Sequence, residues 1–167
     1  MAVILRRAGL AMIHTLKQLF STLFMPPGAD AAAQEHVLRL ASAVLLVEMM
    51  RADHDCRQVE RQAAVDALTA GFGLADDEVA RLLELADTVA RDASDLYSFT
   101  SRLKDGFSLE QRVRMVEQLW QVAFADGYLS HHETQLMLKL GDLLYIPRAD
   151  FVAAKQRARA AAGLPAA

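Results

Sequence analysis

The sequence has a single cysteine, Cys56, four prolines and no apolar run that approaches the roughly 18 residues of a membrane span. One cysteine excludes an intramolecular disulfide and suits a reducing compartment. No compact apolar segment is followed by a small-residue cleavage site, so we expect a cytoplasmic protein. The chain also lacks a Gly-rich phosphate loop, an HExxH pair, a CxxC pair and a Ser-His-Asp signature, so catalysis has no positive support.

Acidic residues are missing from the first 29 positions, which contain Arg6, Arg7 and Lys17. The whole chain carries a net charge of −3, so the remainder carries −6 and should prefer cations or basic partners. A pI near 5.9 predicts no nucleic-acid partner. Apolar residues make up 53% of the 167 positions, which is enough for one compact domain with a sizeable core.

A short acidic turn occurs twice in the chain. The clearer copy lies between two apolar helical runs, and in it Asp126 is followed seven positions later by Glu133. The other copy has Asp53 and Glu60 at the same spacing, 73 positions earlier. The repetition indicates a duplicated helix-turn-helix unit that carries a cluster of carboxylates.

The second acidic turn has the residues that end one helix and begin the next. Gly127 suits the positive φ that closes a helix, and His54 takes its place in the first copy. Ser130 and Glu133 form an S-x-x-E capping box. Asp126 lies at a helix C-terminus, where the helix dipole disfavours an anion by about 0.3–1 kcal/mol. We therefore expect a cation or a hydrogen bond to offset that cost.

Helical periodicity runs through the whole sequence, and no segment alternates convincingly like a strand. We predict an all-α protein: a compact bundle of about seven to eight helices built from two pseudo-repeated helix-turn-helix-helix units. The predicted helices span residues 3–24, 30–51, 57–70, 74–91, 96–106, 109–125, 131–144 and 148–161.

The predicted domain organisation has three parts. Residues 1–29 form a basic amphipathic helix and a Pro-Pro-Gly linker, residues 30–161 form the all-α domain, and residues 162–167 form a flexible tail. The helix 30–51 is apolar over most of its circumference, so we expect it at the buried centre of the first unit.

Three segments of the chain resemble the tellurite-resistance TerB-like family: residues 48–53 (EMMRAD), 95–100 (DLYSFT) and 119–127 (LWQVAFADG). The likeness covers about residues 30–158. It implies a compact, all-helical cytoplasmic domain, carboxylates that bind a divalent metal, and a role in stress-response or membrane-associated assemblies, without a defined catalytic reaction. The family's acidic positions correspond here to Asp53, Glu60, Asp126 and Glu133, and His54 departs from the family's glycine.

The carboxylates of the two turns are the candidate metal ligands. Ca²⁺ takes about six to eight oxygen ligands, and Mg²⁺ takes about six with waters among them. If the turns face each other, they supply several side-chain ligands, and we predict a Ca²⁺ or Mg²⁺ site there. The candidate ligands are Asp53, Asp55, Glu60, Asp126 and Glu133.

Three alternatives to this site stay open. The acids could serve only as helix caps and solvated charges in a metal-independent scaffold, or they could hold ions that activate water in a hydrolase. His131 and His132 could join Asp126 in a Zn²⁺ site, but neighbouring helix residues point about 100° apart, so we expect solvated histidines.

Glu48 and Glu117 lie on apolar helices and should pair with basic neighbours.

The first predicted helix carries an apolar stripe between Met12 and Phe24. This stripe could pack on the core, bind a protein partner, or lie on a membrane surface. Three cations give only about 3 kcal/mol of attraction to an anionic surface, so membrane contact through residues 3–24 should be weak. We assign the aromatic side chains Trp120, Phe124 and Tyr128, which recur every four residues, to core packing.

Overall fold

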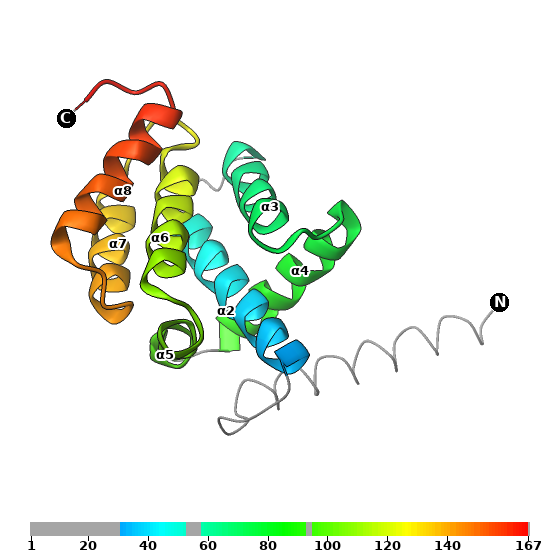
Figure 1. The fold of residues 1–167 in the computed structure, drawn as a ribbon. Helices are drawn as coiled ribbons and strands as arrows, with labels where there is room; N and C mark the ends of the chain where they lie inside the picture. Colours follow the sequence, from blue (N-terminus) through cyan, green and yellow to red (C-terminus); the bar gives the residue numbers. More distant parts are fainter. Residues whose placement is uncertain (1–30, 53–57, 93–94, 167) are drawn as a thin grey trace, which may run out of the picture.

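The computed structural model describes residues 31–52, 58–92 and 95–166 and is all helical over them, without strands. Seven helices follow one another in this part of the chain (Figure 1). The all-α prediction is confirmed. The predicted helix 3–24 lies outside the described residues. The helices are α2 (Ala31–Ala52), α3 (Gln58–Phe72), α4 (Asp76–Asp92), α5 (Tyr97–Gly106), α6 (Leu109–Phe124), α7 (His131–Leu143) and α8 (Arg148–Ala161).

Helix α2 is the centre of the bundle. Every residue from Leu40 to Val47 is buried, and the helix contacts α3, α4, α5, α6 and α7. A helix that is apolar on most sides is stable only when other helices cover it from several directions. The expectation that this segment is a buried centre is confirmed, and its neighbours come from both halves of the chain.

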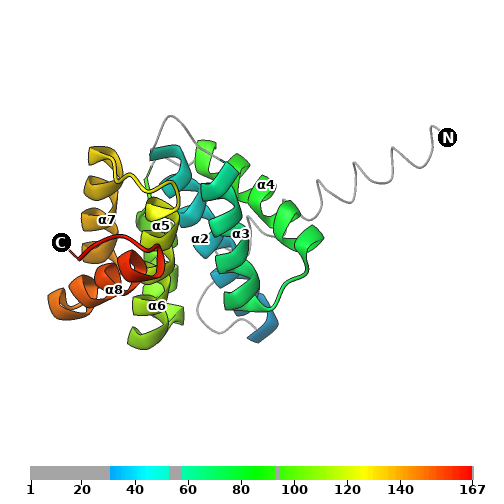
Figure 2. The same cartoon turned by 90° about the horizontal axis from the view of Figure 1, so that it is seen from above.

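The most extensive helix pairs are α6 with α8 and α2 with α4. In each half of the chain, the first long helix therefore packs chiefly on the third helix of its own half, and α2 and α6 also contact each other. Figures 1 and 2 show α2 and α6 running in the same direction, so their C-terminal ends lie at the same end of the bundle. The internal duplication itself stays a prediction.

Aromatic packing joins α6 to α8. Trp120 is 1% exposed, and its ring stacks on Phe124 and meets Phe151 edge-on, each at a centroid distance of 5.6 Å. Lys155 lies over the indole at 4.9 Å. A large ring in the middle of a helix pair fixes how the two helices approach, because it must be covered on all sides. This contact holds α8 against the helix that leads into the second acidic turn.

The expected pairing of the two intrahelical glutamates is confirmed. Glu48 accepts from Arg51 at 3.2 Å within α2, and Glu117 on α6 accepts from Arg157 on α8 at 2.7 Å. These carboxylates have ordinary structural partners. The second pair also ties α8 to α6 at the surface.

Candidate functional site

The second acidic turn begins where α6 ends. Gly127 has a φ of 79°, which a residue without a Cβ adopts readily, and its N–H donates to the Phe124 carbonyl at 2.9 Å. The half-buried Asp126 accepts a 2.9 Å hydrogen bond from the backbone N–H of Tyr128. This bond supplies the compensation expected for an anion at a helix C-terminus, and it holds the aspartate in the turn.

The start of α7 shows the predicted capping box. Ser130 accepts from the backbone N–H of Glu133 at 3.1 Å, and a Glu133 carboxylate oxygen accepts from the Ser130 N–H at 2.7 Å. Ser108 and Gln111 make the same reciprocal pair at the start of α6. Glu133 is nevertheless unlike an ordinary capping glutamate, because it is completely buried.

The first acidic turn is described only from α3 onward. Asp53 and Asp55 lie outside the described residues, together with His54 and Cys56. Glu60 lies in the first turn of α3 and is 0% exposed, the same value as Glu133. Fully buried glutamates are rare, because a buried charge must be offset by partners. The structure thus places the same unusual feature at both positions that the predicted repeat connects.

The three described candidate ligands do not make a metal site by themselves. Within residues 31–52, 58–92 and 95–166, no three His, Cys, Asp or Glu side chains gather closely enough to hold an ion, and this includes Glu60, Asp126 and Glu133. The helix ends that precede the two turns lie at one end of the bundle (Figures 1 and 2). A site shared by the two turns therefore needs the aspartates of the first turn.

The structure shows where the two histidines beside the turn and the three regularly spaced aromatic residues lie. His131 and His132 are exposed, with ring centroids 6.2 Å apart. Trp120 and Phe124 are buried as predicted, but the assignment of Tyr128 to the core is wrong, because this residue is 68% exposed. The helix ends before Tyr128, so the four-residue spacing no longer carries its ring to the buried face of α6.

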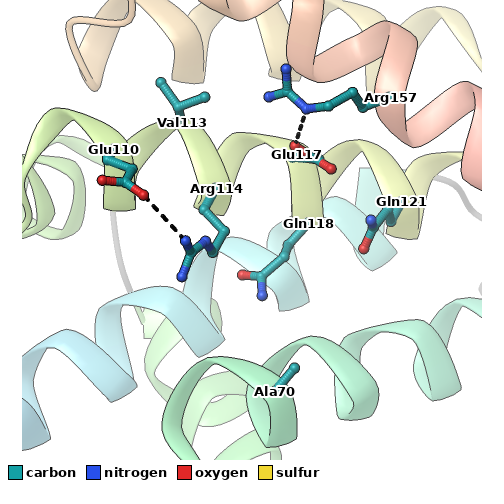
Figure 3. A pocket seen from close by; sticks show the side chains of 8 residues that line it. All are labelled: Ala70, Glu110, Val113, Arg114, Glu117, Gln118, Gln121 and Arg157. Carbon is teal, nitrogen blue, oxygen red and sulfur yellow. Dashed lines mark hydrogen bonds and ion pairs between the residues drawn. The ribbon is translucent and has the colours of Figure 1, made fainter.

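A polar cavity that the sequence did not reveal lies between α3, α6 and α8. Its volume is about 500 Å³, and Figure 3 shows Ala70 facing it from α3 below α6. Gln118, one of the lining residues, donates to the Ala67 carbonyl of α3 at 3.3 Å. The only sign of this cavity in the sequence is a stripe of polar residues on α6. A helix face that contacts water has the same pattern, so the stripe did not indicate a cavity. The lining residues are Ala70, Glu110, Val113, Arg114, Glu117, Gln118, Gln121 and Arg157.

None of the helices in the described part of the chain is both long enough and apolar enough to cross a membrane. This finding bears on residues 31–52, 58–92 and 95–166.

Comparison with known proteins places the chain in a family. The family model described as "Tellurite resistance protein TerB" matches residues 39–156, which is well over half of the chain. Comparisons with curated proteins and with solved structures found no match. The matched region runs from α2 to α8 and includes both acidic turns. With its all-α fold and the extent of this match, the chain belongs to the TerB family.

Proposed function

We propose that this TerB domain is a non-catalytic binding module whose two acidic turns take up a divalent cation, Ca²⁺ or Mg²⁺. The observation that carries the proposal is the complete burial of Glu60 and Glu133, 73 positions apart, each in the first turn of the helix that follows an acidic turn. Carboxylate oxygens are the ligands that Ca²⁺ and Mg²⁺ take in proteins, and these two carboxylates follow the two acidic turns at equivalent positions.

The second turn offers the better-defined half of this site. Asp126 is half-buried and held in place by the Tyr128 N–H, while one oxygen of Glu133 is used by the Ser130 N–H. A carboxylate accepts several hydrogen bonds or metal contacts at once, and these bonds orient the two side chains. Asp53, Asp55 and Glu60 would supply the remaining oxygens from the first turn.

The ion would act by ordering the two turns. Each turn joins a helix at the centre of the bundle to a helix at its surface: α2 to α3, and α6 to α7. A cation that binds only when both turns adopt one arrangement stabilises that arrangement in proportion to its concentration. A protein partner that recognises this end of the bundle would then bind in an ion-dependent way. We place this module in a cytoplasmic stress-response or membrane-associated assembly.

A second candidate function is a metal-independent scaffold, and the capping geometry favours it. Both described carboxylates of the second turn have structural hydrogen bonds of the kind that end and begin helices. In this alternative, the acidic turns only shape the bundle, and the amphipathic segment 3–24 recruits a protein or a membrane.

The isosteric amides separate the two candidates. Asp126→Asn and Glu133→Gln keep an oxygen that accepts the Tyr128 and Ser130 N–H bonds, and the Ser108–Gln111 capping box shows that a glutamine serves in this role. The double variant should therefore fold normally but lose the charge that binds an ion. Glu110→Gln, at an exposed position in the first turn of α6, is the matched control.

The measurement is the melting temperature of metal-stripped protein before and after addition of Ca²⁺ or Mg²⁺, with calorimetric titration alongside. An ion at about 100 times its Kd stabilises by about 2.7 kcal/mol, which raises Tm by roughly 5–10 °C in a domain of this size. We expect that rise in the native protein and the Glu110→Gln control, and its loss in the double variant. An equal rise in all three, or no rise in any, would remove the cation site and leave the scaffold.

A further inference from the structure

The cavity between α3, α6 and α8 continues into a second hollow that reaches α2. The second hollow has a volume of about 330 Å³, and both are lined by Ala70, Arg114 and Gln118. Together they form one groove along α6, from the start of α2 to α8. We call this feature the α6 groove; Figure 3 shows its α8 half.

The α2 half of the α6 groove has an apolar floor. Leu38, Phe72 and Phe107 are each half-buried there, beside the nearly buried Met115. Ser42 also lines this hollow. It is 1% exposed, and its hydroxyl has no hydrogen-bond partner among the described residues. A buried hydroxyl without a bond is unusual, because burial removes the water that would otherwise bind it. The hollow thus offers apolar contact together with one hydrogen-bonding position.

A segment with a matching apolar stripe precedes α2 in the sequence, and the N-terminal part of α2 lines this groove. Residues 3–24 carry the apolar stripe Met12 to Phe24, and they join the described structure at Ala31. Glu35 and Leu38, among the first eight residues of α2, already line the groove. Six residues, 25–30, connect the segment to α2, a reach of at most about 20 Å. Such a short tether gives the segment an effective concentration of about the millimolar range at the groove.

The carboxylates that line the α6 groove are paired with arginines. The groove is lined by the acids Glu35, Glu110 and Glu117 and by the arginines Arg114 and Arg157. Glu35 pairs with Arg39, Glu110 with Arg114 and Glu117 with Arg157, so the assignment of segment 3–24 rests on its apolar stripe and its short tether. An amphipathic helix laid in a groove places its apolar stripe inward and its charges at the rim.

We propose that the α6 groove is the docking site of the chain's own N-terminal segment, residues 3–24. The stripe from Met12 to Phe24 packs over Leu38, Phe72 and Phe107, and a polar group of the segment bonds to the Ser42 hydroxyl. Docking hides the same stripe that a membrane or a protein partner would bind. The groove therefore regulates the availability of the N-terminal segment.

Tryptic cleavage after Lys17 in the full-length protein tests this proposal, because Lys17 lies within the stripe region. Ala70→Trp fills the groove from an exposed position on α3 that faces α6 (Figure 3). Ala80→Trp makes the same change at an exposed position on α4, away from the groove. Cleavage of a docked segment follows the population of its released form, so Ala70→Trp should accelerate the cut about tenfold while Ala80→Trp leaves it unchanged.

A second pair of variants leaves the groove itself intact. Leu23→Glu places a charge in the stripe away from the cut and should accelerate cleavage after Lys17 as Ala70→Trp does, whereas Ser21→Glu, on the polar side, should have little effect. Equal cleavage rates in the native protein, Ala70→Trp and Leu23→Glu would overturn the proposal. Protection of Lys17 from trypsin that disappears on dilution would also overturn it, because the segment would then bind a second copy of the chain. Protection that arises only with anionic vesicles would overturn it as well, because the segment would then bind lipid.

Discussion

Replacement of Gly141 by alanine tests how closely α7 and α8 approach each other. Gly141 is buried in α7, and a Cβ at this position would lie 2.7 Å and 2.8 Å from two ring carbons of Phe151 on α8. Carbon atoms pack at about 3.5–4.0 Å, so the ring would have to move by roughly 1 Å. The Phe151 ring cannot move freely, because it also meets the buried Trp120 edge-on at 5.6 Å.

Two opposing effects set the magnitude for Gly141→Ala. Alanine gains about 1 kcal/mol over glycine in a helix, whereas overpacking a filled site costs about 1–3 kcal/mol. The net expectation is a loss of about 1 kcal/mol of unfolding free energy. In a domain of this size, the loss lowers Tm by roughly 2–4 °C.

Gly71→Ala is the matched control, and the assay is urea unfolding followed by circular dichroism. Gly71 is exposed near the end of α3, and a Cβ there would meet only the Gln118 amide at 3.7 Å, an ordinary contact. This variant should gain about 0.5–1 kcal/mol from helix propensity alone. The two glycine-to-alanine changes are therefore expected to have opposite signs.

A double-mutant cycle with Phe151→Leu identifies the cause. In the Phe151→Leu background the ring is absent, so Gly141→Ala should become neutral or stabilising, with a coupling of about 1–2 kcal/mol. If Gly141→Ala stabilises the native protein as much as Gly71→Ala does, the α7–α8 contact does not limit the packing and the reasoning is refuted.

Three further changes test the turns and caps by the same unfolding assay. Ser130→Ala removes the hydroxyl that accepts from the first turn of α7 and should cost about 0.5–2 kcal/mol; a cost near zero would mean that water replaces this cap. Tyr145 has a φ of 53°, so Tyr145→Gly should be more stable than Tyr145→Ala by about 1 kcal/mol, and equal stabilities would argue against strain at this position. The Arg112 guanidinium donates to the Leu144 carbonyl at 2.6 Å across 32 positions, so Arg112→Met should cost about 1–3 kcal/mol, and a loss under 0.5 kcal/mol would contradict that role.

Several features of the fold could be predicted from the sequence because their causes are local. The capping boxes at Ser108 and Ser130 and the positive φ of Gly127 depend on residues within one or two turns. The predicted start of each described helix lies within two residues of the observed one, because caps and periodic apolar positions act over the same short range. The TerB family was also recognisable from three short segments.

The candidate site was only partly predictable. The acids of both turns stood out by their repetition, and the sequence assigned Glu133 to its cap correctly. Its complete burial, and that of Glu60, could not be read from the sequence, because an S-x-x-E box leaves the glutamate on the surface or in the core depending on what packs above it. The prediction that Tyr128 packs in the core was wrong, because a four-residue spacing keeps side chains on one face only while the helix continues.

The sequence by itself determined the helices, their ends and the positions of the two acidic turns, since hydrogen bonds to the nearest backbone groups and the 3.6-residue period are properties of consecutive residues. Only the tertiary structure decided which helices cover α2, how closely Phe151 approaches Gly141, and where the α6 groove opens. These features join residues that lie tens of positions apart, and the packing of whole helices sets them.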